Sequence, residues 1–123
     1  MKVIIDTNGL MAQGKFGVDV FEELGRLGYD EYVLPSAVVD ELKALEKKVR
    51  GSDKAALAVA KSLALRCQVV EAPGEADNAI VELAKKLVAP VFTNDSELRR
   101  RLRDEGIKTI YMRSKHKLES DHM

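Results

Sequence analysis

Four acidic residues of this chain have the side chains and the placement needed for metal chemistry: Asp6, Glu41, Asp77 and Asp95. Asp6 directly follows the apolar run 3–5, and Asp95 follows the run 91–94 in the same way. The carboxyl ends of parallel strands meet at one edge of an open sheet, where ligands usually bind. Carboxylates gathered there repel one another unless a cation neutralises them, and oxygen ligands suit hard divalent cations. The sequence therefore predicts a divalent metal site.

An alternation of strands and helices would position these acids. The chain predicts strands near 3–5, 31–34, 68–71, 91–93 and 109–112. It predicts helices near 18–27, 37–48, 54–65, 75–88 and 96–105. Short strands alternating with helices imply right-handed crossovers and a mostly parallel sheet covered on both faces. We expect a single α/β domain.

Helical periodicity separates two of the acids from ordinary surface charges. Glu41 lies three residues after Val38 and four before Leu45, so it belongs to the apolar line of the helix 37–48. Asp77 extends the apolar stripe of the helix 75–88 by one turn toward its N-terminus. Burying an unpaired acid beside a core stripe is costly, so each needs a metal or a hydrogen-bond partner.

Each acid also has an ordinary structural explanation. Asp6 would form a strand-ending turn with the two residues that follow it, and Asp77 would favour the positive end of its helix. Asn94 and Glu97 have the spacing of a capping box, which would leave Asp95 as a first-turn acid. Glu75 also falls in a first turn. The four together are harder to explain as caps and turns alone.

Length and composition limit the class of protein. A chain of 123 residues suits one domain with a real core. No apolar run approaches the roughly 18 residues that span a bilayer, and Asp6 and Asn8 interrupt the first apolar stretch, unlike a signal peptide. We expect a cytoplasmic protein with no membrane partner. The one cysteine, Cys67, excludes an internal disulfide and is expected at or near the core.

Charge is balanced overall but uneven along the chain. Twenty basic and twenty acidic residues cancel, whereas residues 98–117 hold eight Lys or Arg against two acids. This basic end is either a solvated helix face with a frayed tail or a surface that contacts phosphates. With six Phe and Tyr in total and no Trp, the chain offers no extensive platform for stacking bases.

Four sequence blocks resemble the PIN-domain ribonuclease family. They read VIIDTNGL at 3–10, LPSAVVDELKAL at 34–45, EADNAIVELA at 75–84 and FTNDSELRRRL at 92–102. Their order and spacing cover nearly the whole chain. The last two blocks, with the basic end IYMRSKHK at 110–117, are most similar to the PIN proteins that process small-subunit ribosomal RNA precursors and to their archaeal relatives.

The resemblance implies a fold and a set of site residues. It implies a three-layer α/β/α fold in residues 1–113, with a five-stranded parallel sheet of order 3-2-1-4-5, followed by a basic, then polar tail over 114–123. It implies metal-dependent RNA hydrolysis with one or two Mg²⁺ or Mn²⁺ ions. The implied catalytic and metal-binding residues are Asp6, Glu41, Asp77 and Asp95, beside the polar residues Asn8, Glu75, Thr93 and Asn94. Candidate RNA-binding residues in the basic end are Arg99, Arg100, Arg103 and Lys115.

Other functions stay open at this point. A receiver or phosphohydrolase domain also places acids at strand ends, but the dehalogenase-like enzymes need Asp-x-Asp where this chain has Asp6, Thr7 and Asn8. A PIN fold can act as an inactive RNA-binding scaffold or as a VapC-type toxin ribonuclease. The sequence does not identify the RNA substrate, which we expect to be single-stranded or a ribosomal precursor. It does not give the oligomeric state either, and a homo-oligomer is one of the alternatives.

Overall fold

The computed structural model describes residues 1–121 and contains six helices and a six-stranded sheet in that range. The elements follow in the order β1 (Lys2–Ile5), α1 (Thr7–Phe16), α2 (Val20–Arg26), β2 (Glu31–Pro35), α3 (Ser36–Leu45), α4 (Ser52–Ala64), β3 (Gln68–Val70), α5 (Ala76–Leu87), β4 (Val91–Phe92), α6 (Ser96–Asp104), β5 (Thr109–Ser114) and β6 (Lys117–Ser120). The predicted α/β alternation is confirmed.

The sheet has the order β3-β2-β1-β4-β5-β6. All neighbouring pairs from β3 to β5 are parallel, so the five predicted strands have the predicted order 3-2-1-4-5. β1 lies at the centre, paired with β2 on one side and β4 on the other. The strand order switches between β1 and β4, because β2 and β3 follow on one side of β1 and β4 and β5 on the other. Open sheets usually bind ligands at such a switch point.

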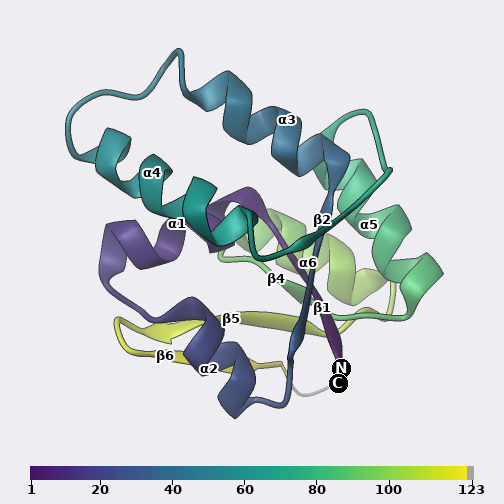
Figure 1. The fold of residues 1–123 in the computed structure, drawn as a ribbon. Coiled ribbons are helices and arrows are strands. Elements are labelled where there is room, and N and C mark those ends of the chain that lie inside the picture. The colour runs from purple at the N-terminus through teal and green to yellow at the C-terminus, as the bar shows by residue number, and fades with distance from the viewer. Residues whose placement is uncertain (122–123) are drawn as a thin grey trace.

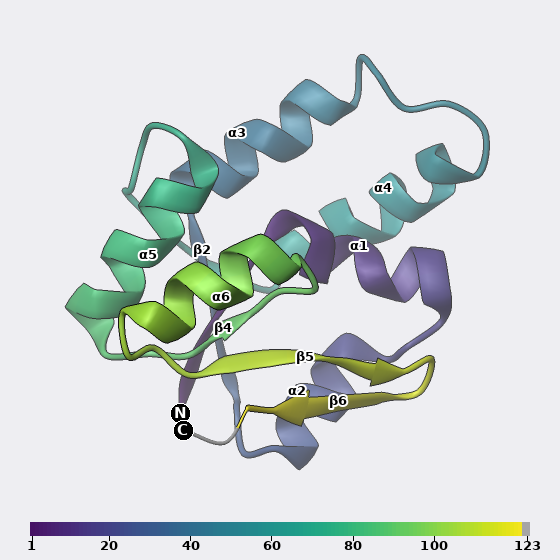
Figure 2. The same ribbon diagram turned by 180° about the vertical axis from the view of Figure 1, so that it is seen from behind.

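Helices cover both faces of this sheet. Figure 1 shows α1, α2 and α4 on one side, and Figure 2 shows α5 and α6 on the other. α3 contacts both α4 and α5, so it bridges the two layers at one edge of the sheet. The arrangement is the expected three-layer α/β/α sandwich.

The central strands form the middle of the core. Val3, Ile4 and Ile5 of β1 are fully buried, as is Phe92 of β4. Parallel strands covered on both faces have continuous apolar runs of this kind because neither side of the strand meets water. Cys67 is half-buried against the core, as expected of a near-core thiol.

Helix α1 was not predicted from the sequence. Its apolar residues Leu10, Met11 and Ala12 are consecutive and give little helical periodicity, and it contains two glycines, which disfavour helix. Packing explains both glycines. A Cβ on Gly14 would lie 2.5 Å from the Cα of Ala56 in α4, and one on Gly9 would lie 3.0 Å from the Phe92 ring. Close helix packing therefore overrides the weak local signal.

The C-terminal expectation was wrong in part. Residues 117–120, expected within a tail that starts at 114, form the antiparallel strand β6. Leu118 lies opposite Met112 in the register and is almost fully buried. A strand with one apolar residue among polar ones is too short to show a periodic pattern. The last part of the expected tail, residues 122–123, lies outside the described residues.

None of the helices in residues 1–121 has the length and apolar character needed to cross a membrane.

Candidate active site

Asp6 lies at the carboxyl end of the central strand and caps the next helix. One carboxylate oxygen, Oδ1, accepts a hydrogen bond from the Thr7 backbone N–H at 2.7 Å. The other, Oδ2, accepts from the Asn8 side chain at 3.0 Å and from the Thr93 hydroxyl at 2.8 Å. The side chain is therefore both the N-cap of α1 and a fixed acceptor at the sheet edge.

The environment of Asp6 opposes its negative charge. The pKa of its carboxyl group is raised to about 6. Burial is the largest cause and the charges of Asp77 and Glu41 add to it, while hydrogen bonds from Thr93 and Thr7 lower the pKa. In residues 1–121 no Lys or Arg forms an ion pair with this carboxylate. A buried acid that lacks a cationic partner marks a candidate functional group.

A polar network links the ends of three neighbouring strands around Asp6. The Asn8 side-chain oxygen accepts from the Asn94 backbone N–H at 2.9 Å, and the Asn94 side-chain oxygen accepts from the Met112 N–H at 2.8 Å. The Asp95 N–H donates to the Thr93 hydroxyl oxygen at 3.1 Å. Three of the predicted polar neighbours, Asn8, Thr93 and Asn94, therefore hold β1, β4 and β5 in a fixed relation.

Asp95 begins helix α6 as its N-cap. One of its oxygens accepts from the backbone N–H groups of Glu97, at 2.9 Å, and Leu98, at 3.3 Å. The cap expected at Asn94 is therefore one residue later, because the Asn94 side chain is occupied by Met112. The second oxygen of Asp95 accepts no hydrogen bond from the described residues and remains available to a ligand.

Asp77 lies in the first turn of helix α5, after Glu75. The Glu75 carboxylate caps this helix, accepting from the Asp77 N–H at 3.1 Å and the Asn78 N–H at 3.2 Å. The Asp77 carboxylate itself takes no part in the cap. Burial, and then the charges of Glu75, Asp95 and Glu41, raise its pKa above the ordinary value.

Glu41 differs from its sequence-based placement. We expected it on the apolar line of α3, but Val38 and Leu42 are buried and Glu41 is exposed. Three residues advance a helix by 300°, so Glu41 lies about 60° from the line through Val38 and reaches the rim instead of the core. It nevertheless lines the same cleft as Asp6 and Asp77.

The four acids line one open cleft of about 620 Å³. Its other lining residues come mainly from α1, α3 and the start of α4: Thr7, Asn8, Met11, Lys15, Phe16, Leu45, Val49, Asp53 and Asn94. Thr7 and Lys15 were not expected at the site because helix α1 was not predicted. Asp53 was not expected because it lies in the first turn of α4, one residue before the predicted start of that helix. Among the described residues, Lys15 is the only Lys or Arg that lines the cleft, against five carboxylates.

The donors of this cleft fit a hard divalent cation in type. They are carboxylate, amide and hydroxyl oxygens, which Mg²⁺ and Mn²⁺ prefer. The buried Thr7 hydroxyl has no hydrogen-bond partner within residues 1–121, which leaves an additional oxygen donor beside Asp6. In the same range no three Asp, Glu, His or Cys side chains already converge into a closed metal site. The set therefore fits a metal held with bridging water or with modest side-chain movement.

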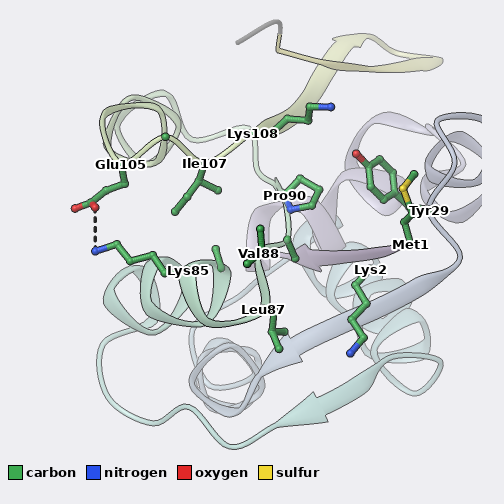
Figure 3. A pocket seen from close by; sticks show the side chains of 13 residues that line it. Met1, Lys2, Tyr29, Lys85, Leu87, Val88, Pro90, Glu105, Ile107 and Lys108 are labelled. Carbon is green, nitrogen blue, oxygen red and sulfur yellow. Dashed lines mark ion pairs between the residues drawn. The ribbon is translucent and has the colours of Figure 1, made fainter.

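The opposite edge of the sheet lacks this chemistry. A hollow of about 710 Å³ lies there, between the ends of α5 and α6 and the start of β1. Figure 3 shows the side chains that line it. Its one lining acid, Glu105, forms an ion pair with Lys85 at 2.9 Å. Size alone would favour this hollow, but its one acid is neutralised, whereas the carboxylates that line the acid cleft form no ion pair within residues 1–121.

The predicted RNA-binding residues lie outside the cleft. Arg99 pairs with Asp121 at 3.1 Å and lies over the Tyr111 ring, 3.9 Å from its centroid. Arg103 also pairs with Asp121, at 3.3 Å. Arg100 is exposed on α6, and Lys115 is exposed in the turn between β5 and β6.

Comparisons with known proteins identify the family. The sequence model of the PIN like domain matches residues 3–115. Ribonuclease VapC9 of Archaeoglobus fulgidus is 34% identical over 110 residues, covering 89% of this chain and 82% of that protein. The structure of the PIN domain endonuclease Utp24 superposes with a TM-score of 0.79 at 26% identity, covering 99% of this chain and 92% of that one. A domain of a functionally unknown protein from Methanocaldococcus jannaschii shares the fold, with a TM-score of 0.67 at 19% identity over 92% of this chain and 91% of that one. Sequence and fold agree over nearly the whole chain, which therefore belongs to the PIN-like domain family.

Proposed function

We propose that this protein is a metal-dependent endoribonuclease that hydrolyses RNA phosphodiester bonds. One observation carries the proposal: four carboxylates from separate elements line a single cleft, and none forms an ion pair within residues 1–121. Structural acids would be neutralised by neighbouring cations or would serve as helix caps. Asp6 and Asp95 do cap α1 and α6, but Glu41 and Asp77 cap no helix in the described residues, so capping does not explain the set. The ribonuclease and endonuclease relatives support the same activity for this chain.

The cleft residues take distinct roles in this proposal. Asp6 is the central metal ligand, with Asp77 and Asp95 on either side and Glu41 binding directly or through water. One or two Mg²⁺ or Mn²⁺ ions would supply an activated water and neutralise the phosphate and the leaving oxygen. Thr93 and Asn8 orient the Asp6 carboxylate through the hydrogen bonds described above.

Glu75 contributes differently. Its carboxylate is occupied by the two N–H groups at the start of α5. It therefore positions Asp77 by fixing the first turn of the helix, and its charge favours the protonated form of that acid. A cation bound in the cleft would instead favour the ionised form of Asp77.

The biological substrate that we propose is ribosomal RNA. The last two sequence blocks and the basic end are most similar to the PIN proteins of small-subunit ribosomal RNA processing. The similarity to ribonuclease VapC9 favours a second candidate, a VapC-type toxin ribonuclease. Cleavage of a ribosomal precursor at one defined position would favour the first, whereas growth arrest on expression, abolished by Asp6→Asn, would favour the second. For both candidate functions we propose that the protein acts in the cytoplasm.

A cleavage assay tests the activity itself. A 5′-labelled single-stranded RNA should be cut internally in Mg²⁺ or Mn²⁺ to leave 5′-phosphate and 3′-hydroxyl ends. Cleavage should stop in EDTA and in the Asp6→Asn variant. Products with 2′,3′-cyclic phosphate, or undiminished cutting in EDTA, would reject the metal-water mechanism. RNA binding without any cutting, also on a ribosomal precursor, would favour the inactive scaffold.

A further inference from the structure

A second basic segment lies outside the basic run at residues 98–117. Residues 43–54, here called the basic arm, span the end of α3, the connecting turns and the start of α4. They include five cations and two acids. The exposed cations are Lys43, Lys47, Lys48, Arg50 and Lys54, and none of them forms an ion pair within residues 1–121. One of the two acids, Glu46, is neutralised by Lys61 of α4 at 2.6 Å.

The basic arm forms one wall of the acid cleft. Its residues Leu45, Val49 and Asp53 line the cleft together with Asp6. Leu45 and Val49 also pack against the core, and the Val49 N–H donates to the Leu45 carbonyl oxygen at 3.0 Å. Figures 1 and 2 show the chain between α3 and α4 projecting away from the sheet. The arm is therefore an ordered projection whose apolar side is anchored and whose cations face solvent.

The floor and wall of the cleft suit different parts of a nucleic acid. The acids repel phosphates, so a strand that enters needs cations at the rim to hold its backbone. The apolar wall of the cleft, between the acids and the cations of the arm, consists of Met11, Phe16, Leu45 and Val49. Phe16 is 47% exposed, so its ring is accessible to a base that enters the cleft. A base can stack on such a ring only when it is unpaired.

We infer that the basic arm binds the backbone of an unpaired RNA strand, while a base of that strand rests on Phe16 beside the acid cleft. This inference rests on the proposed function and adds the surface that holds the RNA backbone and the side chain, Phe16, that favours an unpaired base. Phosphate contacts come from Lys47, Lys48, Arg50 and Lys54. A duplex would meet the same cations but would hide its bases from the apolar wall.

The C-terminal basic run is less suited to this task. Arg99 and Arg103 lie about 6 and 12 Å beyond Asp95 along the axis of α6, at 1.5 Å per residue. Both are paired with Asp121, whose N–H donates to the carbonyl oxygen of Thr109 at the amino end of β5. They would have to give up these ion pairs in order to bind phosphate, whereas the arm cations have none to break.

Salt-dependent RNA binding tests the inference. The arm variant carries Lys47→Gln, Lys48→Gln and Lys54→Gln. A matched control carries Lys2→Gln, Lys86→Gln and Lys108→Gln, three exposed lysines at or near the opposite edge of the sheet, where Figure 3 labels Lys2 and Lys108. Binding of a fluorescent 12-nucleotide single strand and of its duplex is measured by anisotropy from 50 to 200 mM KCl. EDTA prevents cleavage, and thermal melts confirm that each variant is folded.

The arm variant should bind the single strand more weakly, with a slope of log K against log salt reduced by about 2, because each lost phosphate contact removes about 0.7. The control should keep the wild-type slope. Phe16→Leu should weaken single-strand binding roughly tenfold with the slope unchanged, and should leave duplex binding as it is. An arm variant with wild-type affinity and slope, or a control with an equal loss, would overturn the inference.

These results are independent of cleavage. A wild type that cuts RNA while the arm variant binds normally would reject only the arm. A wild type that binds RNA through the arm but never cuts it would reject the proposed nuclease and leave the arm supported.

Discussion

Two aspartates at opposite ends of the sheet have similar immediate surroundings and opposite electrostatics. Asp6 follows β1 and accepts a hydrogen bond from the fully buried Thr93 hydroxyl. Asp121 follows β6 and accepts one from the fully buried Thr109 hydroxyl. Asp121 has two arginine partners, Arg99 and Arg103, whereas Asp6 has none and faces other acids.

The pKa values show what this difference means. Burial raises the pKa of both carboxyl groups, but for Asp121 the Thr109 hydroxyl and the two guanidinium groups outweigh it and lower the pKa below its usual value. The pKa of Asp6 is raised to about 6. A structural acid is thus neutralised within the fold, while the cleft acid retains an electrostatic cost that a bound cation would remove.

The largest expected difference between the two aspartates is in activity. Asp6→Asn should reduce the rate of RNA cleavage more than about 100-fold, because even partners of metal ligands account for about 10–100-fold. Asp121→Asn should leave cleavage within a few-fold of wild type at a temperature where it is folded. The measurement is the single-turnover rate on a labelled RNA in Mn²⁺. Comparable losses in the two variants would remove the distinction.

The two substitutions should have the opposite order in their effects on stability, with Asp121→Asn the more destabilising. Asp121→Asn weakens a partly buried group with three partners, so it should lower the free energy of unfolding by roughly 1–3 kcal/mol in urea melts at pH 7. The folded-state pKa of Asp121 is depressed, so its contribution is present above the unfolded pKa and is lost as pH falls through the folded value. The difference in stability between wild type and Asp121→Asn should therefore begin to shrink as pH falls below about 4 and continue to shrink as pH falls through the folded-state pKa. A constant difference down to pH 2 would contradict this account.

The two threonines provide a smaller and cleaner test. Thr93→Val removes the hydroxyl that orients Asp6 and should reduce cleavage about 10- to 100-fold, which a rate measurement in Mn²⁺ would show. Thr109→Val, the same change at the other aspartate, should destabilise the fold by about 1 kcal/mol and leave the cleavage rate near that of wild type. If Thr109→Val slowed cleavage as much as Thr93→Val, the hydroxyl at Asp6 would have no special role.

The sequence was informative where a residue lies at the end of a regular element. Asp6 and Asp95 follow apolar runs that had to be central strands, and that placement alone brings both to one edge. Glu41 was harder, because a residue 60° from an apolar line can turn either toward the core or toward the rim, and packing decides. The basic surface inferred to bind RNA was the hardest feature to predict from the sequence. Eight cations in the C-terminal run outnumber the five of the arm, but sequence does not show that Asp121 neutralises two of them.

Thermal melts with and without Mn²⁺ test the central claim, that the cleft acids form a metal site, most directly. Asn is as good an N-cap as Asp, so Asp6→Asn should keep or raise the melting temperature in EDTA at pH 7.5, since it removes a repelled charge. Wild type should gain about 2.7 kcal/mol at a hundredfold excess of Mn²⁺ over its Kd, and the variant much less. Equal Mn²⁺ shifts in the two proteins, or a variant clearly less stable than wild type in EDTA, would contradict Asp6 as the central ligand.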